Sequence, residues 1–144
     1  MLVITHALVG GFLTQKISPP FLSYPLVLAS HFLMDRLPHW DVGALFSVSR
    51  KKMLAVFGAF DLVGALVLSW LVFQKSSPFK PFLWGGVFLS ILPDLIEFPV
   101  IFFDFRPYPL KKFEDFHSRF FHRKARFWPG LIPQIILVIL VLFC

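Results

Sequence analysis

The sequence predicts an all-α integral membrane protein, a bundle of four to five helices with a further amphipathic helix at the membrane interface. Of its 144 residues, 57% are hydrophobic and only 15% are charged, and the mean hydropathy of +0.75 lies outside the range of soluble domains. The apolar residues form continuous runs without alternation, which argues against strands. A chain this short has no room for a soluble catalytic domain besides these helices, so any active site must lie among them.

Five apolar segments within a single membrane domain, 1–144, are predicted to be helices. They are 1–15, 20–35, 53–73, 81–103 and 130–144. The first has no basic start and no small-residue cleavage site, so we interpret it as a functional helix and not as a signal peptide. The second and fourth begin at prolines, where the missing amide hydrogen costs least. The third lies between the basic SRKK and the turn-rich QKSSPFKP, and the first and last are short for a full span.

The basic segment 105–128 has the pattern of an interfacial amphipathic helix. On a helical wheel one face carries Phe113, Phe116, His117, Phe120 and Phe127, whereas the charged residues lie elsewhere. We therefore expect His117 to face the bundle and His122 to face water.

Basic residues are concentrated in two of the connections. The connections after the second and fourth apolar segments contain eleven Lys and Arg residues, and the other two contain three. Because basic residues collect in cytoplasmic loops, we expect both connections in the cytoplasm, and with five crossings the N-terminus as well. Cys144 would then lie on the far side. The net charge of +6 is assigned to this topology and not to nucleic acid, since no nucleic-acid recognition motif accompanies it.

Ionisable side chains occur inside the apolar segments, where an Asp costs about 2.5–3.5 kcal/mol at mid-membrane on insertion scales. These residues are His6, His31, Asp61, Asp94 and Glu97. With the predicted topology all of them fall in the cytoplasmic half, within about 15 Å of depth at about 1.5 Å of rise per residue. Polar residues placed at random would be divided between the leaflets. We therefore expect them to converge on one polar centre.

The stretch SHFLMDRLPHWD is the densest polar group of the chain. His31 and Asp35 are four residues apart, so on a helix they share a face about 6 Å apart, which suits two ligands of one metal ion. Pro38 is expected to end the helix. His39 then either folds back beside the pair or, with Trp40, marks the membrane interface.

Short motifs scattered over most of the chain carry a resemblance to a known family. They are Thr5-His6, SHxxxDxxPHWD from Ser30, Asp61, the LPD ending at Asp94, and His117-Ser118. They resemble the small membrane-bound metal-dependent hydrolases of the YdjM type and, more distantly, the zinc-dependent phospholipase C and P1 nuclease group. Here HxxxD precedes the PD and HS motifs, whereas that family has the reverse order. The resemblance implies a divalent metal, zinc, bound by His31, Asp35, Asp94 and His6, with His117 and Asp61 as further ligands.

These patterns favour a membrane-embedded metal-dependent hydrolase. Imidazole and carboxylate are normal zinc ligands, and a hydrolytic site needs three or four of them and one position for water. The expected ligands are His6, His31, Asp35, Asp94, His117 and His39. This set exceeds the needs of one ion, so one or two ions are expected, and a carboxylate-bridged pair suits phosphoester hydrolysis. Glu97 or Asp61 would be the catalytic base or would orient a histidine.

The expected substrate is an amphiphilic ester that enters from membrane lipid at the cytoplasmic leaflet. A phospholipid or other phosphoester is the first candidate. We expect the protein in the inner (cytoplasmic) membrane of a bacterium. Three other functions remain open: a metal or proton carrier, a b-haem protein and a structural membrane subunit. Asp61 has the alternative of joining two helices, and Glu97 that of pairing with Arg106 or Lys111. The sequence does not specify the exact ester, the choice between zinc and manganese, or the oligomeric state.

Overall fold

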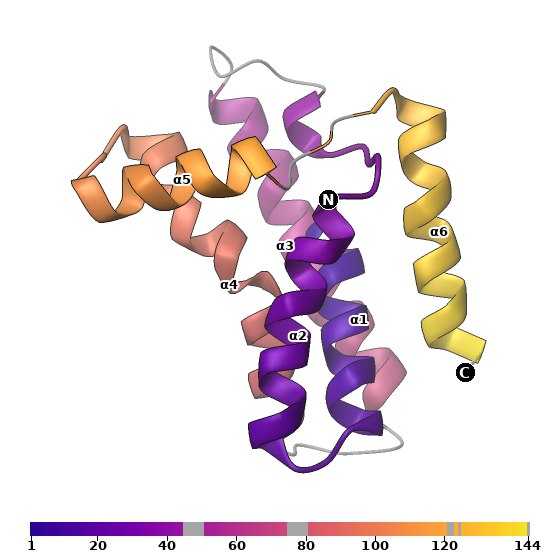
Figure 1. Cartoon of the computed structure of the whole chain (residues 1–144). Coiled ribbons are helices and arrows are strands. Elements are labelled where there is room, and N and C mark those ends of the chain that lie inside the picture. Colours follow the sequence, from indigo (N-terminus) through magenta and orange to yellow (C-terminus); the bar gives the residue numbers. More distant parts are fainter. Residues whose placement is uncertain (45–50, 75–80, 121–122, 124, 144) are drawn as a thin grey trace.

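The computed structural model of the chain describes residues 1–44, 51–74, 81–120, 123 and 125–143. Its elements are α1 (Val3–Lys16), α2 (Pro20–Asp35), a 3-10 turn (Val42–Ala44), α3 (Lys51–Phe73), α4 (Pro81–Phe103), α5 (Tyr108–Phe120) and α6 (Phe127–Phe143) (Figure 1). No strand occurs in the ranges just given, so the all-α class is confirmed. The predictions for His122 and Cys144 fall outside the described residues.

One predicted element differs from the structure. The amphipathic segment 105–128 is divided, because α5 ends at Phe120 and Phe127 begins α6. The first amides of a helix have no partner within it, so a proline costs least there, and Pro129 lies in the first turn of α6. Phe127 therefore leaves the face assigned to it and packs edge-on against Trp40, with ring centroids 5.0 Å apart.

The first helix is the centre of the bundle. It packs against α2, α3, α4 and α6, and α5 packs on α4. The close approach of α1 to α4 depends on glycines on both helices, because a Cβ atom at Gly10 would overlap Ser90 and one at Gly86 would overlap Thr14. Small residues allow this kind of backbone approach between helices. The buried apolar core lies around these contacts and includes Ala7, Leu8, Ala65, Phe73, Leu83, Val87, Ile91 and Val141.

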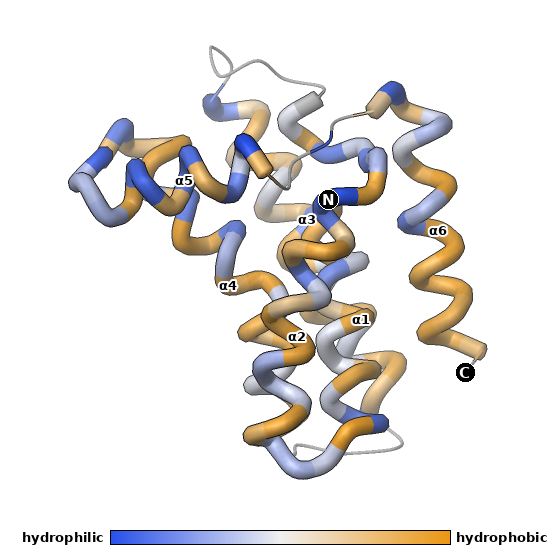
Figure 2. The backbone as a smooth tube through the Cα atoms, viewed as in Figure 1, coloured by the Kyte–Doolittle hydropathy of each residue, from blue (hydrophilic) through white to orange (hydrophobic). Residues whose placement is uncertain are grey.

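Successive helices run up and down the bundle, so that one end collects several helix termini. The starts of α1, α3 and α6 and the ends of α2 and α4 lie toward the end where the N-terminus is found, and the C-terminal end of α6 points the other way (Figure 1). Among the coloured residues, hydrophilic ones are more numerous toward that same end than toward the other, where a few occur at the connection of α1 and α2 (Figure 2). The fold thereby brings the ionisable residues of different helices together.

Two helices are long and apolar enough to cross a membrane by length and composition. These are α3 and α4, with 23 residues each, or about 35 Å at about 1.5 Å per residue, against a hydrocarbon core of about 30 Å. The apolar α6 is shorter. With 14 and 16 residues, α1 and α2 are below the length of about 20 residues that a perpendicular span needs.

Candidate metal centre

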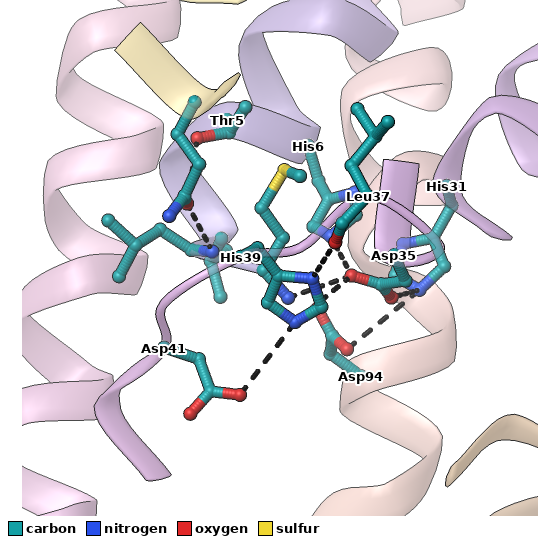
Figure 3. Close-up of polar contacts among 12 residues, drawn as sticks. Thr5, His6, His31, Asp35, Leu37, His39, Asp41 and Asp94 are labelled. Atoms are coloured by element: carbon teal, nitrogen blue, oxygen red, sulfur yellow. Dashed lines mark hydrogen bonds and ion pairs between the residues drawn. The ribbon is translucent and has the colours of Figure 1, made fainter. Parts of the chain in front are cut away.

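The carboxylate of Asp35, the last residue of α2, is the centre of a buried polar cluster (Figure 3). Asp35 Oδ2 lies 3.2 Å from Nε2 of His31 and 3.0 Å from Nε2 of His117. Asp35 Oδ1 lies 3.2 Å from Nε2 of His6 and 2.7 Å from the amino group of Met1. All of these side chains are fully buried. Groups from the start of the chain, α1, α2 and α5 therefore meet on one carboxylate.

A backbone carbonyl orients the ring of His31. Nδ1 of His31 lies 2.6 Å from the carbonyl oxygen of Ser90 on α4. Because a carbonyl oxygen only accepts, Nδ1 carries a proton, and in a neutral ring the lone pair is then at Nε2. That Nε2 has no hydrogen-bond partner among the described residues. A lone pair that faces a carboxylate oxygen in a buried site is unfavourable unless a cation lies between them.

Glu97 orients the ring of His117 as Ser90 orients that of His31, with Nδ1 held and Nε2 facing Asp35. Nδ1 of His117 donates to Glu97 Oε1 at 2.7 Å, and Nε2 donates to Asp35 Oδ2 at 3.0 Å. Burial lowers the pKa of His117, but the hydrogen bonds to Asp35 and Glu97 outweigh burial and raise the pKa to about 9. A carboxylate that holds the far nitrogen of an imidazole is the usual support of a metal-binding histidine. Exchange of the Nε2 proton for a metal ion would leave this orientation intact.

Arg106, one of the two basic residues considered as alternative partners of Glu97, pairs elsewhere. Arg106 donates to Asp104 at 2.6 Å and to Glu114 at 3.4 Å, all at the surface. Glu97 is therefore a partner of His117 in this structure, and its side chain is 14% exposed.

Asp94 completes a group of four candidate ligands. Asp94 Oδ1 lies 3.8 Å from Nε2 of His31, and Asp94 Oδ2 has no hydrogen-bond partner among the described residues. One ligand atom from each of His31, Asp35, Asp94 and His117 lies within 4.8 Å of the other three. Two atoms bound about 2.1 Å from one zinc ion in tetrahedral geometry are about 3.4 Å apart. This group could therefore hold a metal ion.

His39 lies on the other side of the Asp35 carboxylate, so the chain does fold back after α2. The ring is fully buried, and Nδ1 lies 2.9 Å from the carbonyl oxygen of Leu37. Nε2 of His39 is 3.9 Å from Asp35 Oδ1 and 3.9 Å from Asp41 Oδ2 (Figure 3). His6 approaches the same oxygen and stacks on His31, with ring centroids 4.1 Å apart. The other five predicted metal ligands thus lie around the carboxylate of the sixth, Asp35.

Asp61 of α3 contacts the first residues of α1 and lies outside this group. Asp61 Oδ2 accepts from the amide of Val3 at 2.8 Å, and Oδ1 accepts from the amide of Ile4 at 3.2 Å. The first amides of a helix have no partner within it, and the residue before α1, Leu2, provides no side-chain cap. A carboxylate from α3 therefore joins two helices, as one interpretation of the sequence allowed, and a catalytic role for Asp61 stays a prediction.

Sequence reasoning missed Gln134 of α6. Its Nε2 donates to the carbonyl oxygens of Trp40 and Gly130, both at 2.8 Å, and its Oε1 accepts from the amide of Leu2 at 2.9 Å. Gln134 thus ties α6 to the start of the chain and to the segment that carries His39. The available signal was a single amide in the otherwise apolar run PQIILVILVLF.

Comparison of the chain with protein-family models, with curated proteins and with solved structures finds no match. Fold and site together define an all-helical protein with two helices that could span a membrane and a buried histidine and aspartate group that could hold a metal ion.

Proposed function

We propose that this protein is a membrane-embedded, zinc-dependent hydrolase that acts on a phosphoester or other ester of a lipid-like substrate at the cytoplasmic leaflet. The observation that carries the proposal is the shared orientation of two imidazoles. The carbonyl oxygen of Ser90 and the carboxylate of Glu97 hold the Nδ1 atoms of His31 and His117, so both Nε2 atoms face Asp35 Oδ2. Nitrogen and oxygen ligands of this number suit zinc.

The surface of the helices supports a position in the membrane. Large apolar side chains are exposed on several helices, including Phe21 of α2 at 80% and Phe60 of α3 at 71%. Soluble monomers rarely expose apolar patches larger than a few hundred Å². Lipid contact would remove this surface from water.

The amphipathic α5 supports a site at the membrane surface. Its only buried side chain among the described residues is His117, while Tyr108, Phe116 and Phe120 are exposed together with the basic Lys111 and Lys112. Apolar and basic side chains of this kind place a helix in the headgroup region of an anionic leaflet. We assign that leaflet to the cytoplasmic side from the distribution of Lys and Arg.

Substrate would reach the site along α4. The partly exposed members of the cluster on this side are Asp94, at 25%, and Glu97, at 14%. A bound divalent ion supplies Lewis acidity to an ester or water oxygen. Glu97 is not one of the four candidate ligands, but its carboxylate contacts one of them, His117. We therefore assign proton transfer to Glu97.

Two of the alternatives fit the geometry less well. A carrier needs ionisable groups along its whole path, whereas the buried polar side chains in the half away from the site include hydroxyls such as Thr14 and Ser23. Axial haem ligands point their nitrogens at one iron from opposite faces of a porphyrin. His6 and His31 instead stack face to face at 4.1 Å.

Hydrolysis of micellar ester substrates by the detergent-purified protein tests the proposal. The panel contains a chromogenic phosphodiester, a phosphomonoester and a carboxyl ester of matched chain length. We expect turnover of a phosphoester that EDTA abolishes, that Zn²⁺ restores, and that Glu97→Gln lowers at least tenfold. Glu114→Gln, which changes an acid on the outer side of α5, is the matched control. Stoichiometric metal without turnover of any ester would refute the hydrolase and favour a carrier or a structural subunit.

A further inference from the structure

We propose that His6 is a positioning residue and not a metal ligand. In this role Nε2 of His6 donates a hydrogen bond to Asp35 Oδ1, and the other oxygen, Oδ2, binds a single ion together with His31, Asp94 and His117. The proposal rests on the proposed function, because it concerns the same metal centre. It gives His6 a different role from the one that the sequence resemblance implies.

The two oxygens of Asp35 have different surroundings. Oδ2 faces Nε2 of His31 at 3.2 Å and Nε2 of His117 at 3.0 Å. Oδ1 lies 2.7 Å from the amino group of Met1 and 3.2 Å from Nε2 of His6. A carboxylate oxygen has two lone pairs, and N–H donors from these two groups use both lone pairs of Oδ1. Only Oδ2 is then available to an ion.

The partner of Nδ1 distinguishes the tautomer of His6 from that of His31. Nδ1 of His31 lies 2.6 Å from the carbonyl oxygen of Ser90, which leaves the lone pair of the neutral ring at Nε2. Nδ1 of His6 is buried and has no hydrogen-bond partner among the described residues. The acceptor that the structure gives to His6 is Asp35 Oδ1, 3.2 Å from Nε2, and a hydrogen bond to a charged oxygen is stronger than one to a neutral group. His6 is therefore the Nε2–H tautomer, a donor, whereas neutral His31 is a ligand.

The four candidate ligands do not need His6. One ligand atom from each of His31, Asp35, Asp94 and His117 lies within 4.8 Å of the other three, and His6 is not in this group. A hydrolytic zinc site needs an open position for water, and a fifth protein ligand would compete with water for that position.

The place of His6 in the fold suits a residue that orients a ligand. Its ring is fully buried and stacks on the ring of His31, with centroids 4.1 Å apart. His6 belongs to α1, and Asp35 is the last residue of α2, so the hydrogen bond ties the ligand to the central helix of the bundle. Loss of an outer partner of this kind typically costs about 10- to 100-fold in metal affinity.

Nitrogen NMR of the metal-free full chain, with isotopic nitrogen in the histidine rings, reads the tautomers directly. We expect a proton on Nε2 of His6 and on Nδ1 of His31, with the signals assigned by their loss in His6→Gln and His31→Gln. A proton on Nδ1 of His6 alone would overturn the proposal, because Nε2 could then not donate to Asp35.

Two substitutions of His6 separate a donor from a ligand. Gln places an amide N–H near the position of Nε2 but is a poor zinc ligand, whereas Phe fills the volume of the ring and has no donor. His6→Gln should bind Zn²⁺ nearly as the wild type does, and His6→Phe should lose about 10- to 100-fold in affinity. X-ray absorption at the zinc edge should detect one ion with two imidazoles in the wild type and in His6→Gln, and one imidazole in His31→Gln.

The contrary results distinguish the positioning role from the proposed function. Three imidazoles or more than one ion in the wild type, the loss of an imidazole in His6→Gln, or wild-type affinity in His6→Phe would overturn the positioning role and leave the proposed function standing. A wild-type chain without stoichiometric metal would overturn both. The imidazole count of the wild type needs no variant, so it decides the question even if His6→Phe does not fold.

Discussion

Removal of the Glu97 carboxylate should weaken metal binding without removing a ligand. Glu97 accepts the Nδ1 proton of His117 at 2.7 Å, and loss of such an outer partner typically costs about 10- to 100-fold in metal affinity, or about 1.4–2.7 kcal/mol. Glu97→Gln keeps an oxygen that can accept this hydrogen bond but loses its charge, so we expect a loss near tenfold. Glu97→Ala loses the acceptor as well and should approach 100-fold.

Competition between the purified protein and a chromogenic chelator for Zn²⁺ measures this affinity directly. The order wild type, Glu97→Gln, Glu97→Ala should hold for affinity, while the number of ions bound at saturation stays unchanged. Glu114→Gln, on the same end of the bundle but bonded to Arg106, should bind Zn²⁺ as the wild type does. A Glu97→Ala variant with wild-type affinity would refute the view that this carboxylate prepares His117 for a metal ion.

Three further predictions concern pH, the cap of α1 and helix packing. Since His117 has a pKa of about 9, its proton competes with the metal ion below that pH. The affinity for metal should therefore rise with pH up to about 9. Calorimetry near neutral pH should detect one proton released on metal binding by the wild type, and this proton should be missing in His117→Ala. In the metal-free protein the same raised pKa stabilises the fold below pH of about 6.5, and this contribution should be lost as the pH rises through about 9. Asp61→Ala leaves two amides of α1 without acceptors and should cost about 1–3 kcal/mol of unfolding free energy in detergent. Gly86→Ala would place a Cβ atom against Thr14 and should cost about 1–3 kcal/mol, measured by the same unfolding assay.

The controls for these variants are positions of the same residue type that neither cap a helix nor separate two helices. Asp104→Asn removes the charge of an exposed acid that pairs with Arg106 at the surface and should change the unfolding free energy by less than about 1 kcal/mol, so an equal loss in both Asp variants would exclude the capping role. Gly58→Ala adds a Cβ atom where no atom lies within 4 Å and should be neutral or stabilising. If Gly86→Ala changes the unfolding free energy as little as Gly58→Ala does, α1 and α4 do not pack as closely as described.

The helices and the central ligand pair were predictable because local patterns determine them. The i, i+4 spacing of His31 and Asp35 places them together on any helix, and the structure has Nε2 and Oδ2 3.2 Å apart. The continuous apolar runs and the prolines at helix starts likewise marked α2 and α4. The inward direction of His117 followed from the amphipathic pattern of α5.

The partners of these residues could not be predicted, because they depend on which helices are in contact and on how those helices are shifted relative to one another along the bundle axis. Nothing local indicates that the carbonyl oxygen of Ser90 receives His31, or that Asp61 caps a helix that lies before it in the chain. The position of His39 depends on backbone hydrogen bonds to residues more than 80 positions away. Pro38 alone indicated where α2 ends, and not the direction in which the chain continues.

Elemental analysis of the detergent-purified protein tests the metal centre most directly, with the wild type measured beside His31→Ala and Asp35→Ala. The wild-type chain should hold stoichiometric transition metal, His31→Ala should hold less, and Asp35→Ala should hold none, because Asp35 is the residue that all the imidazoles share. A wild-type chain without stoichiometric metal, or variants that both retain all of it, would contradict the metal centre.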